Sequence, residues 1–212
     1  MIRKARLLLL LIYFFTSSGM VSPDIKKVFF VVGPPGSGKT TIAASIKNKH
    51  SDLIAHYSVG NLLREEAKQD TDRGHMIMQM IERAQIVPLE VGMDVVSRAI
   101  QQSSKQIILL DGFPPTFEYA LEFEKLTKRD SSVKLMGAIE ILVNEDVAAE
   151  RVLKRSRTDD AREIFEIRYK RYIQNAVVLN AWYQKNYAFH SISGYQTLED
   201  STRSIETYIL LD

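Results

Sequence analysis

The sequence predicts an α/β domain built on a parallel sheet, with five candidate strands and helices on both faces. Two observations predict this fold. Short apolar runs bounded by turn residues alternate with longer segments of helical periodicity, as in a parallel sheet. A glycine-rich turn also joins the first apolar run to a helix within residues 28–49. Since no repeat or linker divides the chain, we expect residues 20–212 to form a single domain.

The individual elements follow from periodicity and from turn residues. The first apolar run, residues 28–32, is continuous, as expected of a strand buried on both faces. The other strand candidates are 53–57, 107–110, 138–143 and 189–192. The helix candidates are 39–49, 62–68, 74–83, 88–102, 119–127, 146–154, 161–187 and 198–211.

Composition excludes several classes of protein. The chain has 212 residues, of which 45% are hydrophobic and 25% charged, as in an ordinary globular protein rather than a disordered or polytopic membrane protein. The absence of cysteine excludes a disulfide framework, a thiolate metal site and a cysteine nucleophile. Three of the 28 basic residues lie in the first six positions, so the remainder carries 25 basic and 26 acidic residues. This balance gives no support for a nucleic-acid partner.

Residues 1–19 are set apart from the domain by their composition. Arg3, Lys4 and Arg6 precede a nine-residue apolar run, which is too short to span a bilayer. A basic start, a short apolar run and small residues resemble a secretory, organelle-targeting or anchoring segment. The alternative is that translation begins at Met20 and that the segment is absent. We expect a cytoplasmic protein without a stable membrane span, and targeting by residues 1–19 is the alternative.

Residues 33–40 read GPPGSGKT and form a complete phosphate-binding loop between a strand and a helix. Glycine lets backbone N–H groups surround a phosphate, and the helix N-terminus adds a positive dipole end. Lys39 supplies a mobile positive charge, and Thr40 supplies a hydroxyl for Mg²⁺. The loop therefore predicts binding of nucleotide phosphates together with Mg²⁺. The predicted ATP-binding residues are Gly33, Gly36, Ser37, Gly38, Lys39, Thr40 and Thr41.

Asp111 is the candidate metal partner of this loop. It ends the apolar run 107–110, at the sheet edge where α/β proteins bind ligands. A carboxylate in this place holds Mg²⁺ directly or through water. The alternative is a helix-capping aspartate. We expect Thr40 and Asp111 to form the Mg²⁺ site.

Four further stretches carry a resemblance to a known family. They are SVGNLLR at 58–64, QIVP at 85–88, DGFP at 111–114, and RVLKR at 151–155 with Asp159, Asp160 and Arg168. With the phosphate loop, they resemble the short nucleoside monophosphate kinases of the adenylate kinase and UMP-CMP kinase family. The resemblance implies a P-loop kinase fold with an acceptor-binding helical segment around 58–88 and a short lid around 154–162. It also implies a monomer that transfers the γ-phosphoryl group of MgATP to a nucleoside monophosphate.

Roles are carried over residue by residue from this resemblance. Arg151 and Arg155 are implied to meet the adenine and phosphates of ATP, and Arg157 and Arg168 to bridge the donor and acceptor phosphates. The implied catalytic residues are Lys39, Arg155, Arg157 and Arg168. The implied acceptor-binding residues are Ser58, Val59, Gly60, Arg64, Gln85, Ile86, Val87, Gly112, Phe113, Pro114, Tyr119, Arg157 and Arg168.

The sequence departs from the family at the acceptor site. Pro115 replaces an arginine that helps to hold the acceptor phosphate, and proline has no donor to offer. Lys128 or Arg129 is the candidate to compensate. Tyr119 replaces a glutamine that reads adenine, and Val59 replaces a threonine of adenylate kinases. The acceptor therefore stays open between AMP, the family default, and UMP or CMP. The lid between Arg155 and Asp159 is also shorter than in other short-lid members.

Two alternatives remain at this point. Arginines and acids alternate in residues 151–171, which is also typical of an exposed helix with salt bridges. This interpretation is strongest for Arg162 and Arg171, which match no residue of the family. The departures also leave open a non-catalytic nucleotide-binding relative that acts as a sensor or binds a partner. A phosphate-loop kinase acting on another small molecule is the third hypothesis.

Overall fold

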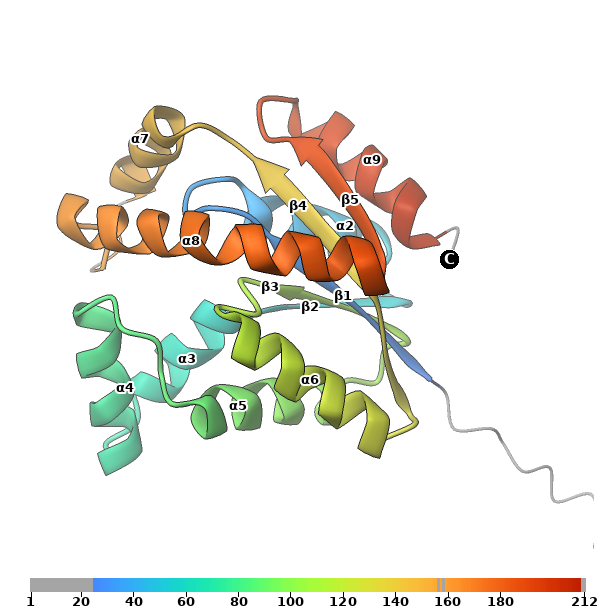
Figure 1. The fold of residues 1–212 in the computed structure, drawn as a ribbon, viewed down its shortest axis with the longest axis horizontal. Coiled ribbons are helices and arrows are strands. Elements are labelled where there is room, and N and C mark those ends of the chain that lie inside the picture. The colour runs from blue at the N-terminus through green and yellow to red at the C-terminus, as the bar shows by residue number, and fades with distance from the viewer. Residues whose placement is uncertain (1–24, 156, 158, 211–212) are drawn as a thin grey trace, which may run out of the picture.

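The computed structural model describes residues 25–155, 157 and 159–210. Its five strands form one parallel sheet in the order β2-β3-β1-β4-β5 (Figure 1). The strands are β1 (Lys26–Val32), β2 (Ile54–Ser58), β3 (Ile107–Asp111), β4 (Val133–Leu142) and β5 (Ala188–Ser193). The predicted α/β fold with five parallel strands is confirmed.

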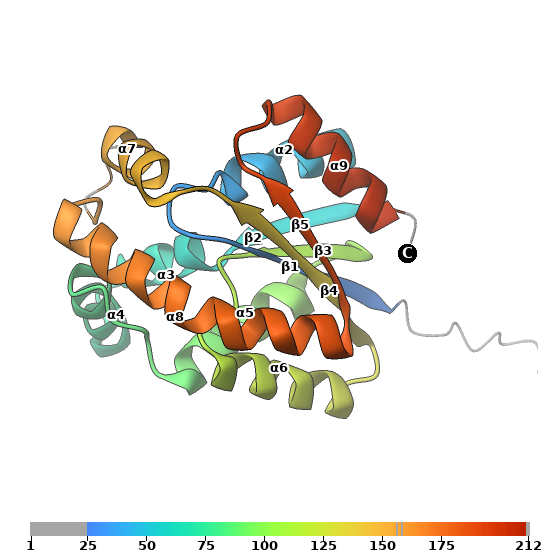
Figure 2. The ribbon, with the colours of Figure 1, turned by 45° about the horizontal axis from the view of Figure 1, so that its top comes forward.

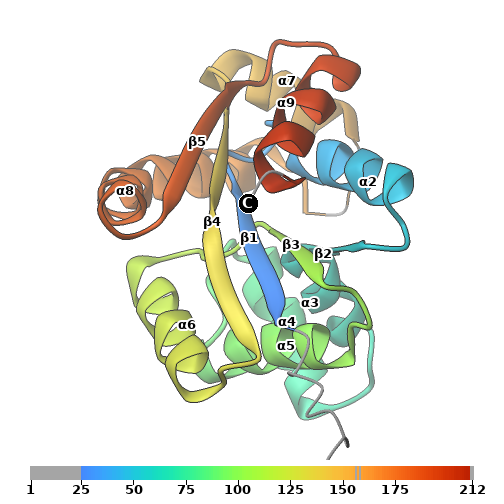
Figure 3. The same cartoon turned by 90° about the vertical axis from the view of Figure 1, so that its right-hand side faces the viewer.

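Helices cover both faces of the sheet. Helices α2 (Lys39–Lys49) and α9 (Leu198–Leu210) cover one face. Helices α5 (Leu89–Gln102), α6 (Phe117–Arg129) and α8 (Arg162–Asn186) cover the other. Figure 3 shows α6 and α8 on one side of the strands and α2 and α9 on the other. The remaining helices, α3 (Val59–Ala67), α4 (Asp72–Glu82) and α7 (Glu145–Arg155), lie beyond the carboxyl ends of the strands (Figure 2).

The central strand β1 divides its side chains between the two cores. Phe29 and Val31 pack in the core beneath α2 and α9, whereas Val28 and Phe30 pack in the core beneath α5, α6 and α8. All four are fully buried, because successive residues of a strand point to opposite faces. This explains why the first apolar run is continuous.

Strand β4 begins earlier than predicted. It starts at Val133 rather than at residue 138. The added residues pair with β1 from Lys26 onwards, and the register shifts between Val28 and Phe29. Lys134 is exposed within this extension, so the sequence there lacks a continuous apolar run.

The N-terminal segment, residues 1–19, lies outside the described residues. Among the helices that the structure describes, none is both long and apolar enough to cross a membrane.

Candidate active site

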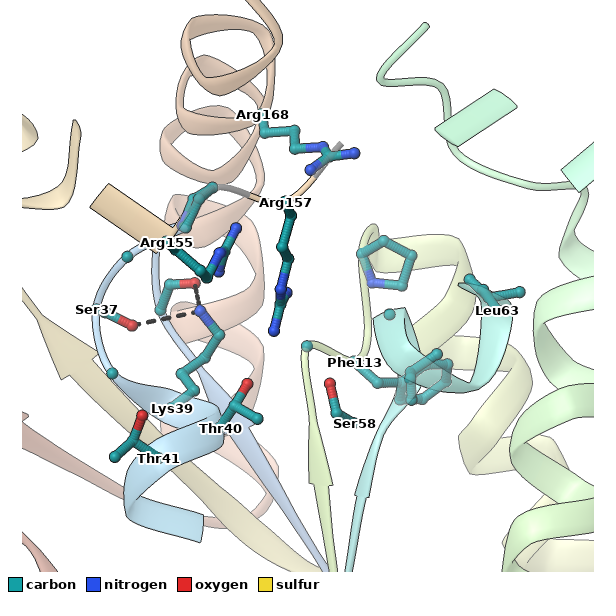
Figure 4. Close-up of a pocket in the computed structure, with 18 of the residues that line it drawn as sticks. Ser37, Lys39, Thr40, Thr41, Ser58, Leu63, Phe113, Arg155, Arg157 and Arg168 are labelled. Atoms are coloured by element: carbon teal, nitrogen blue, oxygen red, sulfur yellow. Dashed lines mark hydrogen bonds between the residues drawn. The ribbon is translucent and has the colours of Figure 1, made fainter. Parts of the chain in front are cut away.

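One cavity of about 800 Å³ opens at the carboxyl edge of the sheet. Figure 4 shows the phosphate loop on one side of it, Ser58 and Phe113 on the other, and three arginines above. Most of the predicted site residues line this cavity. They are Gly33, Gly36, Ser37, Gly38, Lys39, Thr40, Thr41, Ser58, Val59, Gly60, Arg64, Gln85, Ile86, Val87, Gly112, Phe113, Tyr119, Arg151, Arg155, Arg157 and Arg168. Asp111 lies beneath Thr40, and Pro114 lines a smaller adjoining cavity.

The phosphate loop connects β1 to α2 and depends on left-handed backbone. Gly36 has φ +82° and Gly38 has φ +97°, a conformation that residues with a Cβ adopt only at a cost. The Lys39 ammonium donates to the carbonyl oxygens of Gly33 and Pro34 at 2.8 and 2.7 Å, and to Ser37 Oγ at 3.3 Å. The lysine thus lies across the loop, where an incoming phosphate would replace these acceptors.

Burial sets the protonation of this lysine. It lowers the pKa of Lys39 from 10.5 to about 8; the charge of Asp111 opposes this shift and that of Arg155 adds to it. Because burial penalises the charged form, the ammonium is protonated at neutral pH but loses its proton at a lower pH than an exposed lysine does. Phosphate binding requires the protonated form.

A pH dependence follows from this pKa. Lys39 carries its charge below about pH 8 and loses it above, so we expect kcat/KM for MgATP to fall above that pH, approaching about tenfold per pH unit. Initial rates between pH 7 and 10 at saturating acceptor measure this. Lys39→Arg is the control, because arginine stays protonated throughout this range. We expect the residual kcat/KM of this variant not to fall above about pH 8. A flat wild-type profile up to pH 9.5 contradicts the prediction.

Asp111 and Thr40 have the geometry expected of a Mg²⁺ partner. Thr40 Oγ1 donates to Asp111 Oδ2 at 2.5 Å, and His56 Nε2 lies 3.5 Å from the same oxygen. Although burial opposes ionisation, hydrogen bonding by His56, the charge of Lys39 and hydrogen bonding by Thr40 lower the pKa of Asp111. The carboxylate is therefore charged, and the donating hydroxyl keeps its lone pairs for a cation.

The described residues contain no cluster of three or more His, Asp or Glu side chains placed around a metal. Mg²⁺ does not require one when it arrives with a nucleotide, since phosphates and water supply most of its ligands. The pair Thr40 and Asp111 therefore fits Mg²⁺ that is bound together with ATP.

The half of the cavity that the resemblance assigns to the acceptor, called the acceptor half below, is built by α3 and by the segment between α4 and α5. Ser58 ends β2 and Val59 begins α3, which places Arg64 about one and a half turns into the helix. Arg64 donates to both oxygens of Asp159, at 3.3 and 2.9 Å. The acceptor segment is therefore tied to the lid through an arginine that is also placed to bind a phosphate.

The two lid aspartates hold the lid arginines in place. Arg155 donates to both oxygens of Asp160, at 2.9 and 2.5 Å, and the backbone N–H of Arg157 donates to Asp160 at 3.0 Å. Arg168 Nη1 lies 2.7 Å from Asp159. Burial opposes ionisation of both aspartates. Hydrogen bonds from Arg64 and then Arg168 nevertheless lower the pKa of Asp159. Those from Arg155 and the Arg157 backbone lower the pKa of Asp160. The carboxylates thus orient the guanidinium groups toward the cavity.

Arg157 differs from its neighbours in its charge balance. No carboxylate lies within 4.0 Å of its guanidinium in the part of the chain that the structure describes. Burial, and then the charges of Arg155 and Arg64, lower its pKa. Figure 4 shows its side chain extending between Lys39 and the acceptor half of the cavity. An anion in this position would relieve the repulsion between the cations.

The loop after β5 contributes to the cavity, although no sequence motif predicted this. Both terminal nitrogens of Arg151 donate to the carbonyl oxygen of Gly194, at 3.0 and 3.1 Å. Gly194, Gln196 and Leu198 line the cavity beside the phosphate loop. Their position after the last strand is the one signal that could have found them, because the carboxyl ends of the strands of a parallel sheet lie at one edge, where the cavity opens.

Tyr119 lies in the wall of the acceptor half. It is 4% exposed, and its hydroxyl lies within hydrogen-bonding distance of the carbonyl oxygens of Val87, at 2.8 Å, and Pro88, at 3.0 Å. Burial and the charge of Glu90 raise its pKa to about 12, so the hydroxyl stays protonated. The replacement of glutamine by tyrosine therefore joins α6 to the segment before α5.

We expect Tyr119→Phe to lower the free energy of unfolding by about 1–3 kcal/mol, because the buried Val87 carbonyl loses its donor. Urea denaturation measures this loss. Tyr57→Phe is the control: Tyr57 is partly buried and its hydroxyl makes no hydrogen bond within the described residues, so we expect its substitution to change stability by about 0.5 kcal/mol or less. Equal stability of Tyr119→Phe and the wild type would contradict the prediction.

The structure corrects two expectations about compensating cations. Lys128 and Arg129 do not line the cavity; their side chains are 69% and 76% exposed and lie near Glu124 and Glu122 of α6. The alternative interpretation of Arg171, as part of an exposed helix with salt bridges, is wrong, because Arg171 lines the cavity with Arg168. Arg162 does match that expectation, because it is exposed and lies 3.1 Å from Glu166.

A phosphate loop, residues from 58–64 and 85–87, and several arginines face one cavity, which is the arrangement expected of a nucleoside monophosphate kinase. The sequence model of the adenylate kinase family matches residues 31–188. The chain is 44% identical to the adenylate kinase of Nitratiruptor sp. over 88% of its length and 96% of that protein. It is 37% identical to that of Wolinella succinogenes, over 87% and 98%, and 36% identical to that of Helicobacter pylori strain G27, over 88% and 98%. The chain belongs to the adenylate kinase family, and it is a phosphotransferase that acts on nucleotides.

Proposed function

We propose that the protein reversibly transfers the γ-phosphoryl group of MgATP to AMP, forming two molecules of ADP. The observation that carries the proposal is the single cavity with a phosphate loop at one end and an acceptor segment at the other. The curated relatives are named adenylate kinase, which favours AMP among the nucleoside monophosphates. The further proposals are a monomer and a cytoplasmic location, where ATP is available.

In the proposed reaction, an oxygen of the AMP phosphate attacks the γ-phosphorus of ATP. The bond from that phosphorus to the bridging oxygen breaks, and the electron pair leaves with ADP. This transition state needs alignment and charge neutralisation more than it needs an acid or a base. Cationic side chains would therefore provide most of the catalysis. Lys39 would hold the β- and γ-phosphates, and Arg155, Arg157 and Arg168 would surround the transferred group.

The lid supplies the second requirement, which is exclusion of water. Arg64 and Arg168 both bind Asp159, so the lid and the acceptor segment meet over the cavity. Without this closure, water would compete with AMP for the phosphoryl group.

Thr40 and Asp111 would hold Mg²⁺, Thr40 through its hydroxyl and Asp111 directly or through water. The ion, when bound with ATP, would supply charge neutralisation at the β- and γ-phosphates. The protein contributes the orientation of these two oxygen ligands through the hydrogen bond that joins them.

The test is ADP formation from MgATP by residues 20–212 with AMP, UMP, CMP, dCMP or GMP as the acceptor. We expect turnover with AMP to exceed turnover with the others. A preference for UMP or CMP would overturn the choice of acceptor. Binding of MgATP with no transfer to any monophosphate would overturn the reaction and favour a nucleotide-binding module.

A further inference from the structure

Arg171 lies one turn after Arg168 on α8 and faces the same cavity. It also lines the adjoining cavity of about 150 Å³, together with Pro115 and Arg168. Residues 115 and 171 thus border a common space, one from the loop between β3 and α6 and the other from α8. The residue at 115 can donate no hydrogen bond to a ligand in that space, whereas Arg171 has five N–H donors.

The charge of Arg171 is not matched by a carboxylate. Across the described ranges, no Asp or Glu oxygen lies within 4.0 Å of its guanidinium. Its partner is the backbone carbonyl of Ala84, to which Nη2 donates. In contrast, Arg64 and Arg168 share the carboxylate of Asp159. A partly buried guanidinium that lies beside another cation and lacks a counter-ion is stabilised when an anion binds in the cavity.

The contact with Ala84 places Arg171 next to the acceptor segment. Ala84 directly precedes Gln85 and Ile86, which line the acceptor half of the main cavity. A single carbonyl acceptor leaves most of the guanidinium donors available to a ligand.

We propose that Arg171 binds the phosphate of the acceptor nucleotide, together with Arg64, and so replaces the donor that Pro115 cannot provide. This inference rests on the proposed function, because the acceptor is a nucleoside monophosphate. It assigns a role in binding to a residue that stands outside every motif of the sequence. Phosphate bound in this way would also link α8 to the acceptor segment.

The test compares Arg171→Met with Arg162→Met, a control on the same helix whose side chain is 63% exposed. Loss of a hydrogen-bonded charge costs about 1.5–3 kcal/mol, so we expect KM for AMP to rise by about 10- to 150-fold. KM for MgATP should stay within about twofold, and Arg162→Met should leave both constants unchanged. Arg171→Lys, which keeps the charge, should lie between the wild type and Arg171→Met.

Rescue separates phosphate binding from a structural role. We expect Pro115→Arg to restore at least about tenfold of the lost AMP affinity in the Arg171→Met background. In the wild-type background it should change KM for AMP by less than about threefold. An unchanged KM for AMP in Arg171→Met, or an equal loss of AMP and MgATP affinity without rescue, would overturn the assignment.

Calorimetric titration with AMP keeps this inference distinct from the proposed reaction. If the wild type bound AMP but transferred no phosphoryl group, the proposed function would fail. Loss of AMP binding in Arg171→Met alone, with binding retained in Arg162→Met, would still support the role of Arg171. Equal AMP binding by the two variants would refute it.

Discussion

Replacement of Lys39 by methionine is expected to lower kcat/KM for MgATP by about 10²- to 10⁴-fold. The side chain keeps its length and apolar stem but loses the ammonium. Two charge-assisted contacts to phosphate, at about 1.5–3 kcal/mol each, give this range. The loss should be in kcat as well as in KM, because the charge on the transferred group is neutralised by this ammonium only in the assembled site.

Steady-state rates of ADP formation measure the effect, with Lys47→Met as the matched control. Lys47 lies on the same helix and is exposed, so its substitution should leave both constants unchanged. Unchanged turnover in Lys39→Met would refute the mechanism proposed for the phosphate loop. Burial lowers the pKa of Lys39, so removal of the charge is expected to stabilise the empty protein slightly rather than to unfold it.

Replacement of Gly36 by alanine is expected to damage both the loop and the lid. Gly36 has φ +82°, and an added Cβ would collide with the carbonyl oxygen of Ala148 and lie 3.0 Å from its carbonyl carbon and Cα. These are backbone atoms of α7, the helix that carries Arg151 and Arg155. Relief of the clash must therefore displace the loop or the helix. We expect MgATP affinity to fall by at least about 100-fold, equivalent to about 2.7 kcal/mol.

Gly38→Ala is the control for backbone strain without this collision. Gly38 has φ +97°, but the nearest atom to its added Cβ is Ile42 Cδ1 at 3.7 Å. The control should lose about 1–2 kcal/mol of unfolding free energy through the left-handed conformation alone. Gly36→Ala should lose clearly more, as measured by urea denaturation. Equal losses in the two variants would show that packing against α7 does not matter.

Most of the fold could be predicted from the local sequence. Most strands contain a short apolar run and most helices have an apolar face, so the local pattern located to within a few residues all five strands and all eight helices that the structure describes. The start of β4 was the largest error, because exposed Lys134 interrupts the apolar pattern at a place where pairing with β1 sustains the strand.

The half of the site that is predicted to bind the phosphoryl donor could also be predicted from the local sequence. The phosphate loop is one continuous octapeptide whose backbone conformation depends on its own glycines. Asp111 followed from the end of a buried strand, and the structure places it against Thr40. Both inferences hold because the chemistry resides in residues adjacent in sequence or at a fixed edge of the sheet.

The acceptor half was decided by contacts between distant segments. Arg171 reaches Ala84, Tyr119 reaches Val87, and Arg64 reaches Asp159. Periodicity says which face of a helix is apolar, but not which backbone carbonyl lies opposite an arginine. It therefore left Arg171 among the exposed charges and suggested Lys128 or Arg129 in its place.

The sequence by itself thus determined the parallel sheet, the phosphate loop and the family. The tertiary structure alone decided which cations face the acceptor and which carboxylates neutralise them. The physical reason is the separation in sequence of the residues that interact. The periodicity of strands and helices and the nucleotide loop are encoded in neighbouring residues. The charge balance of a cavity depends instead on side chains from α3, α7 and α8, which meet only when the sheet has brought their ends together.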